Sequence, residues 1–315
     1  MSISLLQVLY DQQRPLPTEN EYYEKALEDI EFFAISSQIY WLLKQQDQLH
    51  QTPAFFQQRL KQQFDESLSL NVFIKMQMNQ IFKAFEKICI PAIPLKGTYF
   101  AEKYYGHIGA RYTSDIDLLI KPLDVAKAIA CVKSLGFLMV QERIPNHFHW
   151  SFSKPLPNSP IPLTVELHWD LLKLNTSSLK MDEFWNQATP IQSYAYILEL
   201  SDFHTFYMIC LHGWRHNMNS LKYFIDIVQM IYTLQDKLHY ADLFSEAITH
   251  KTLKRISRTL AIVYHCFPQL EKVKQLRLRK RTRLWWDYKA IRNLKYRSLN
   301  NYLNFIHYKF FDKSS

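Results

Sequence analysis

The sequence contains little glycine, and most of it is clustered. Five of the 315 residues are glycine, and four of these lie between positions 97 and 136: Gly97, Gly106, Gly109 and Gly136. Glycine allows tight turns and close backbone approach, and it weakens helices. We therefore expect turn-rich structure between these positions and helices through most of the remaining chain.

Cysteine is scarce as well. Four cysteines occur far apart, and no two of them form a C-x-x-C pair. This spacing argues against a zinc knuckle or a disulfide framework and favours a reducing compartment. A cytoplasmic location is expected.

Long apolar runs are absent. No window reaches the ~18 to 20 uninterrupted apolar residues of a membrane-spanning helix, and the N-terminal stretch lacks the basic region of a secretion signal. Hydrophobic residues nevertheless make up 48% of the chain and aromatic residues 15%, which is typical of a folded globular protein. We expect no membrane partner.

Helical periodicity dominates both ends of the chain. "TENE" at positions 18 to 21 has the pattern of a capping box, and apolar residues then recur at helical spacing up to Trp41, which predicts one long helix. "TP" at positions 52 and 53 predicts the start of a second helix that runs to Ile88. Helical patterns return after about Leu171.

The middle of the chain has a different period. Short helices are predicted at 97–105 and 123–135, and strands at "AIPL", "SDIDLLI", "FLMVQE", "HFHWSFS" and "LTVELHW". The predicted fold class is α+β. The chain is expected to have three regions: an N-terminal helical region at 1–90, an α+β core at 91–175 and a C-terminal helical region with a basic tail at 176–315.

Two aspartates stand one residue apart in the predicted strand "SDIDLLI". Because strand side chains alternate, Asp115 and Asp117 project from one face and Ile116 projects from the other. Two close, desolvated carboxylates repel each other unless a cation compensates them, so a divalent metal ion is expected. Glu166, in the middle of "LTVELHW", is a third acid that could complete the site. Ligation by oxygen alone favours Mg²⁺ or Mn²⁺ over zinc.

A second motif, "PLKGTYF", places Lys96, Gly97 and Thr98 at a predicted junction between a strand and a helix. Backbone N–H groups at a helix start, a glycine that allows close approach and a nearby lysine together predict a phosphate cradle. The segment is too short for a Walker A loop.

The order of these motifs resembles a known family. "LKG", then R-x-x-x-D-I-D-L-L-I, then a helix ending in "LGF", then "VELHW" is similar to the bacterial uncharacterised nucleotidyltransferase family of the polymerase beta superfamily. "LHGWRH" followed by "LKYFIDIVQMI" resembles the helical C-terminal part of that family. The resemblance implies a polymerase beta-like nucleotidyltransferase core, a small mixed sheet with helices, flanked by the N- and C-terminal helical regions.

The resemblance also implies a reaction. Members of the superfamily hold a triphosphate on a glycine and a small hydroxyl residue, and they hold two metal ions on a D-x-D pair and a third acid. The residues at these places are Lys96, Gly97 and Thr98 for the nucleotide and Asp115, Asp117 and Glu166 for catalysis and the metal ions. A nucleoside monophosphate would pass from an NTP, with ATP expected, to RNA or tRNA, a peptide or protein, or a small metabolite, and pyrophosphate would leave.

Arg111 lies four residues before the D-x-D pair and has two interpretations. It could bind the nucleotide and neutralise negative charge as the phosphate is transferred. It could equally be a structural partner of the acids. The sequence leaves both open.

Other histidines raise an alternative function. His147 and His149 share one strand face, as Glu166 and His168 share another, which would suit a His/Asp metallo-phosphodiesterase. The remaining pair, His212 and His216, lies at i and i+4 of a predicted helix but lacks the glutamate of H-E-x-x-H. A packing or hydrogen-bonding role, with Asp226 as a partner, is predicted for that pair.

The positive charge is concentrated near the C-terminus. From Lys272 to Arg297 the chain has eleven basic residues and one acid, interleaved with Trp and Tyr. This pattern would suit an RNA or tRNA acceptor site, or a non-catalytic nucleic-acid-binding module on the same fold. A solvated helix face and an acidic protein partner are the alternatives.

Overall fold

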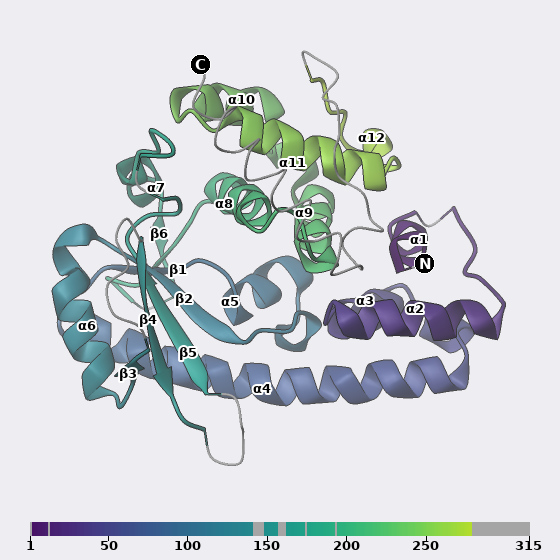
Figure 1. Ribbon diagram of the computed structural model, residues 1–315, viewed down its shortest axis with the longest axis horizontal. Helices are drawn as coiled ribbons and strands as arrows, with labels where there is room; N and C mark the ends of the chain where they lie inside the picture. Colours follow the sequence, from purple (N-terminus) through teal and green to yellow (C-terminus); the bar gives the residue numbers. More distant parts are fainter. Residues whose placement is uncertain are drawn as a thin grey trace. The chain divides into compact units, whose positions relative to one another are not determined.

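The computed structural model describes residues 2–11, 13–140, 148–156, 162–173, 175–192 and 194–278 (Figure 1). Most of the basic segment 272–297 therefore lies outside the described residues, as does His147. The described chain forms two compact units, one made of residues 1–64 and 206–278 and the other of residues 65–205. The predicted division at 90 and 175 stays a prediction. Within the described ranges, no helix combines the length and apolarity needed to cross a bilayer.

The 65–205 unit contains a five-stranded mixed sheet with the strand order β1-β2-β5-β4-β3. Its strands are Ala92–Pro94 (β1), Asp115–Ile120 (β2), Leu138–Met139 (β3), His149–Lys154 (β4) and Leu163–His168 (β5). β2 and β5 are parallel, and the other neighbouring pairs are antiparallel. The predicted α+β class and the small mixed sheet are confirmed, although β3 has only two residues.

Short helical elements connect these strands. They are Thr98–Phe100 (α5), a π-helical turn at Ala101–Tyr105 (η2), 3-10 turns at Ile108–Ala110 (η3) and Pro122–Asp124 (η4), Val125–Ser134 (α6) and Met181–Asn186 (α7). A two-stranded ribbon pairs Thr189–Pro190 (β6) with Leu198–Glu199 (β7). Both helices predicted for this region are therefore present.

The two faces of the five-stranded sheet differ because polar and apolar residues alternate along its central strands. Ile116 and Leu118 of β2 and Val165 of β5 lie on the apolar face, in one buried cluster. That cluster also contains residues of α6 and of the long helix Ala54–Lys87 (α4), so both helices cover this face (Figure 1). Polar side chains of β2, β5 and β4 lie on the opposite face.

The other unit is helical. Its helices are Ser2–Leu9 (α1), Asn20–Phe32 (α2), Ser36–Gln45 (α3), the first part of α4, most of Asp202–Arg215 (α8), Leu221–Leu234 (α9), Tyr240–Thr249 (α10), Leu253–Cys266 (α11) and Leu270–Val273 (α12). Two 3-10 turns, Leu49–Gln51 (η1) and Gln235–Lys237 (η5), complete it. All four cysteines of the chain are free thiols.

The prediction of one long helix up to Trp41 is wrong, because the chain forms α2 and α3 with a break at Ala34. Ala34 has a φ of 52°, in the left-handed region, and its N–H donates to the carbonyl oxygen of Glu31, which ends α2. Ile35 and Ile39, which follow the break, are both fully buried. The apolar positions of α2 and α3 thus face the interior of one unit from two separate helices. Periodicity alone does not distinguish two such helices from one long helix.

The predicted capping box before α2 is also wrong. The helix begins at Asn20, so Thr18 lies outside it, and the Thr18 hydroxyl donates to the carboxylate of Glu19 at 3.2 Å. Glu21 pairs with Lys25 one turn further along the helix. Both side chains therefore have partners other than the backbone N–H groups that a capping box would satisfy.

Candidate active site on the polar face of the sheet

The central strand pair brings the three predicted acids together. In the parallel register, Asp117 of β2 lies opposite Glu166 of β5, and Asp115 lies opposite Thr164. Paired residues of neighbouring strands project from the same face. The Asp117 side chain is 1% exposed, whereas Asp115 and Glu166 are 26% and 24% exposed. One carboxylate is therefore deep in the site, and two lie nearer its opening.

Lys96, which follows β1, contacts both aspartates. Its Nζ lies 3.0 Å from Oδ2 of Asp115 and 2.7 Å from Oδ2 of Asp117. The backbone N–H of Leu95 donates to the carbonyl oxygen of Asp117 at 3.0 Å, which sets Lys96 beside the pair. Burial by itself would lower the pKa of Lys96, but the charges of Asp117 and Asp115 outweigh it and raise the pKa. An ammonium group thus occupies the point where two carboxylates converge.

His168 connects Asp117 to Glu166. Its Nε2 lies 3.0 Å from Oδ1 of Asp117 and 3.2 Å from Oε2 of Glu166. Burial would raise the pKa of Asp117, but the Lys96 charge and the hydrogen bond from His168 hold that pKa well below its usual range. Burial would also raise the pKa of Glu166, and the hydrogen bond from His168 lowers it. The sequence had suggested His168 only for a phosphodiesterase, and its contact with Asp117 was missed.

His168 makes the stability of the metal-free protein depend on pH. Burial would lower its pKa, but hydrogen bonds to Asp117 and Glu166 raise it above the ordinary value of 6.5. Its contribution to the free energy of unfolding is therefore present below pH 6.5 and is lost as pH rises through the folded-state pKa. Urea unfolding with EDTA above pH 6.5 should show this decline, and His168→Asn should show less of it. Identical pH curves for the two proteins would contradict the assignment.

Gly97 forms a tight turn before α5, and Thr98 is the first residue of that helix. Gly97 has a φ of 81°, and a Cβ atom there would lie 3.2 Å from Cγ2 of Thr113. The Thr98 hydroxyl oxygen is buried and has no hydrogen-bond partner among the described residues. The predicted cradle thus has a glycine whose conformation L side chains rarely adopt and a hydroxyl group that a ligand oxygen could satisfy.

Arg111 and Asn71 support the loop that enters β2. The Arg111 side chain is buried, and its guanidinium carbon lies 5.4 Å from the centre of the Phe100 ring. Asn71 of α4 is fully buried, and its Nδ2 donates to the carbonyl oxygens of Ile108 at 2.6 Å and Arg111 at 2.7 Å. Its Oδ1 accepts from the N–H of Thr113 at 3.2 Å. No role was predicted for Asn71, which is a polar residue in the apolar stripe of α4.

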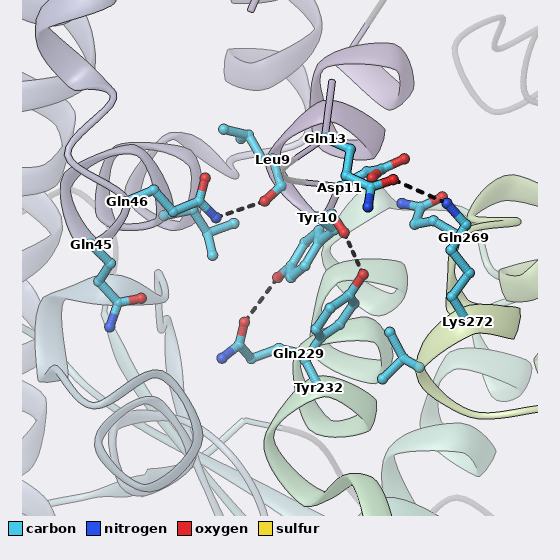
Figure 2. Close-up of a pocket in the computed structure, with 12 residues that line it drawn as sticks. Leu9, Tyr10, Asp11, Gln13, Gln45, Gln46, Gln229, Tyr232, Gln269 and Lys272 are labelled. Carbon is cyan, nitrogen blue, oxygen red and sulfur yellow. Dashed lines mark hydrogen bonds between the residues drawn. The ribbon is translucent and has the colours of Figure 1, made fainter. Parts of the chain in front are cut away.

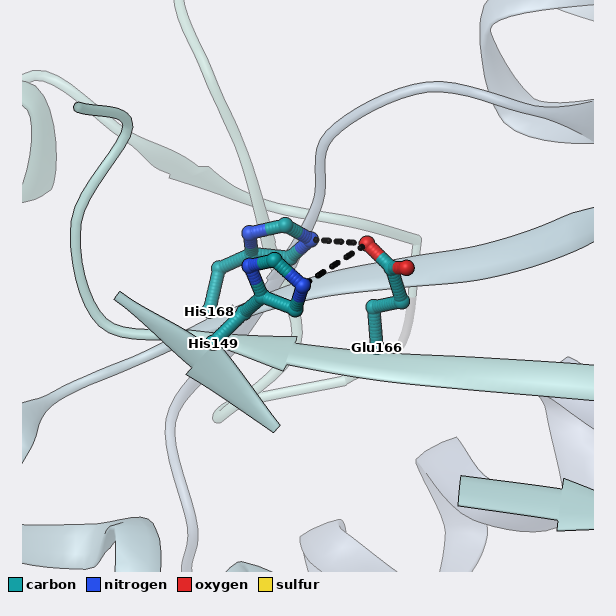
Figure 3. Close-up of side chains that lie close together, drawn as sticks. All are labelled: His149, Glu166 and His168. Carbon is teal, nitrogen blue, oxygen red and sulfur yellow. Dashed lines mark ion pairs between the residues drawn. The ribbon is translucent and has the colours of Figure 1, made fainter. Parts of the chain in front are cut away.

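The two other histidine groups have different surroundings. His149 of β4 lies beside the acids, with its Nε2 3.9 Å from Oε2 of Glu166 (Figure 3). At the end of α8, Arg215 Nη2 lies 3.2 Å from Nδ1 of His212 in the helix and 3.4 Å from Nε2 of His216, which follows it. The rings of both these histidines also pack on Tyr223. His212 and His216 therefore have the packing and hydrogen-bonding role predicted for them, with Arg215 and Tyr223 as partners. The predicted partnership with Asp226 stays a prediction.

A pocket of about 470 Å³ lies in the helical unit (Figure 2). In its wall, Gln46 donates to the carbonyl oxygen of Leu9 at 2.7 Å, and the Tyr10 hydroxyl donates to Gln229 at 3.0 Å. Lys272, the first residue of the basic segment, also lines it. None of the predicted nucleotide or metal residues does, so we assign this pocket no part in the chemistry.

A comparison with protein families gives a match over most of the chain. The sequence profile of a family described as "Uncharacterised nucleotidyltransferase" matches residues 27–268. No curated protein and no solved structure matches the chain significantly. The matched span includes the D-x-D strand, the turn at Gly97 and Glu166. Since the match covers most of the sequence, this chain belongs to the uncharacterised nucleotidyltransferase family.

Proposed function

We propose that this chain is a bacterial cytoplasmic enzyme with a polymerase beta-like core that transfers a nucleoside monophosphate from an NTP, ATP being the expected donor. Pyrophosphate is the second product. The observation that carries the proposal is the convergence of Asp115, Asp117 and Glu166 on the polar face of a mixed sheet. Membership of a nucleotidyltransferase family supports the reaction class.

The charges of the site fit divalent cations such as Mg²⁺ or Mn²⁺. Three carboxylates meet one ammonium group and two imidazoles, so the negative charge exceeds the positive charge when the imidazoles are neutral. The ammonium group of Lys96 lies between the two aspartates. A metal ion bound by both aspartates would place its positive charge at the same point. Carboxylate oxygens are the ligands that such ions prefer.

Each residue then has a role. Asp115 and Asp117 would hold the nucleotide-bound ion, and Glu166 would join them in holding a second. Bound ions would neutralise phosphate charge and lower the pKa of the attacking hydroxyl. The backbone at Gly97 and the hydroxyl of Thr98 receive the triphosphate, and Lys96, once released from the aspartates, neutralises charge on the departing pyrophosphate.

Arg111 and His168 have narrower roles in the proposed site. Arg111 positions the loop before β2 through its packing on Phe100. His168 is 3.0 Å from Asp117, so it belongs to the same cluster as the D-x-D pair. We therefore do not propose a separate metallo-phosphodiesterase site. A non-catalytic nucleic-acid-binding module would gain nothing from three clustered acids.

Transfer of a radiolabelled nucleotide would identify the acceptor. Purified protein would be incubated with each α-³²P-labelled NTP and Mg²⁺ or Mn²⁺, in the presence of total RNA, total protein or a small-molecule extract. Transfer should leave label in one acceptor fraction and release unlabelled pyrophosphate. Hydrolysis of the NTP without a labelled acceptor, or no reaction with any nucleotide, would count against nucleotidyl transfer.

Gly97→Ala tests the phosphate cradle. The added Cβ would crowd Thr113 and force a strained φ, which costs about 1 to 3 kcal/mol of stability. We expect NTP affinity, measured by calorimetry on the folded fraction, to fall further than this stability loss explains. Gly106→Ala is the matched control, because Gly106 also has a positive φ (76°) but no atom within 4 Å of its Cβ position. Equal NTP affinities for the two variants would exclude the cradle.

A further inference from the structure

Two imidazoles lie beside the carboxylate of Glu166, the third acid of the proposed site. Glu166 Oε2 is 3.2 Å from Nε2 of His168 and 3.9 Å from Nε2 of His149. Figure 3 shows both rings turned toward this oxygen. One ligand atom from each of the three residues lies within 4.8 Å of the others. The nucleotidyltransferase interpretation of the sequence used oxygen ligands alone at Glu166, and the structure places two imidazole nitrogens beside it.

The strand register produces this grouping. His149 of β4 pairs directly with His168 of β5, and Glu166 is two residues from His168 on the same face. The ring centres of the histidines are 4.9 Å apart. Because the three side chains come from two hydrogen-bonded strands, a rigid scaffold holds their relative positions.

The spacing is that of a coordination group. Metal–nitrogen and metal–oxygen bonds of ~2.0 to 2.2 Å place the ligands of one ion roughly 3 to 4.4 Å apart. The three atoms found here need to draw together only slightly to meet that range. Imidazole nitrogen suits first-row transition metals, whereas Mg²⁺ prefers oxygen ligands and binds few protein groups.

We propose that His149 and His168 join Glu166 as ligands of the second metal position and that this position takes a divalent first-row transition-metal ion in preference to Mg²⁺. This rests on the proposed function for its place in the reaction. The oxygen-only position at Asp115 and Asp117 keeps the nucleotide-bound Mg²⁺. The two positions then differ in the ions that they select.

The test uses the full chain, freed of metal by EDTA and loaded with Mn²⁺ as the probe. Pulsed electron paramagnetic resonance detects ¹⁴N nuclei bonded to Mn²⁺, so it reports imidazole ligation whether or not the protein is active. Wild-type protein should show ¹⁴N coupling. His149→Asn should weaken the coupling and raise the Kd for Mn²⁺ by about tenfold or more, while Mg²⁺ binding changes little.

His50→Asn is the control, because that side chain is 67% exposed and lies in the other unit. It should leave both the coupling and the Mn²⁺ affinity unchanged. His168→Asn should abolish most of the coupling, and His149, which is nearer the surface, keeps the test decisive if that variant does not fold. Mn²⁺ bound without ¹⁴N coupling, or with equal affinity in wild type and His149→Asn, would overturn the proposal.

The result is separable from the proposed function. ¹⁴N coupling in a protein that transfers no nucleotide would support the metal position and refute the nucleotidyltransferase reaction. Nucleotide transfer with Mn²⁺ that shows no ¹⁴N coupling would support the reaction and refute the metal position.

Discussion

Asp117→Asn should remove nearly all nucleotidyl transfer while leaving the sheet intact. The substitution keeps the shape of the side chain but deletes the buried charge that faces Lys96 and His168. Metal contacts to a transferring phosphate are worth several kcal/mol, so the rate at saturating NTP should fall by about 10²- to 10³-fold. Mg²⁺, which we assign to the position at Asp115 and Asp117, should also no longer raise the melting temperature. Radiolabel transfer and thermal unfolding with and without Mg²⁺ measure the two effects.

Asp182→Asn is the matched control for this experiment. Asp182 is an exposed aspartate in the first turn of α7, in the same unit as the site. Its loss should change neither the transfer rate nor the metal-induced rise in melting temperature. If Asp117→Asn kept more than a tenth of the wild-type rate, the D-x-D strand would not be the catalytic centre.

Lys96→Met should have opposite effects on the metal-free and the metal-bound protein. Without metal, the variant leaves Asp117 buried with one cationic partner fewer, which should lower the free energy of unfolding by about 3 kcal/mol. With Mn²⁺, the variant should gain more stability than wild type does, because the ion no longer competes with an ammonium group for the same oxygens. Urea unfolding in EDTA and in Mn²⁺ gives both quantities.

Lys103→Met is the control that shows whether the larger Mn²⁺ gain is specific to the loss of Lys96 or follows the loss of another ion-paired lysine. Lys103 pairs with Glu199 at 2.7 Å and with Asp202 at 3.1 Å, in the same unit but away from the D-x-D pair. Its replacement should cost stability without altering the gain from Mn²⁺. An equal Mn²⁺ gain for Lys96→Met and wild type would show that the ammonium group does not occupy a cation position.

Side-chain alternation accounts for the part of the site that the sequence predicted. Alternation puts Asp115 and Asp117 on one face of their strand, and it puts Glu166 on the face opposite to Val165 and Leu167 of its own strand. Which strand lies beside which depends on the whole sheet, so the pairing of Asp117 with Glu166 could not be read from the chain. The contact of His168 with Asp117 follows from that same pairing.

Residues from outside the strands were harder to predict. Lys96 was expected to bind phosphate, and its contacts with both aspartates depend on how β1 pairs with β2. Asn71 had a detectable signal. The apolar stripe of α4 is interrupted between Phe64 and Ile74, and buried Ser67 and Asn71 occupy the missing positions. A polar residue in such a stripe indicates a buried hydrogen-bond network, but its partners come from the tertiary fold.

The parallel pairing of β2 with β5 has a kinetic consequence. These strands are distant in the chain, so the loop between them must close before either gains from the contact. Closure brings Asp117 and Glu166 together at the same moment as the apolar residues behind them. Folding should therefore be slow for a unit of this size. A chain in which this loop has not closed would lack the group of three acids, because Asp117 and Glu166 come from the two strands that the loop joins.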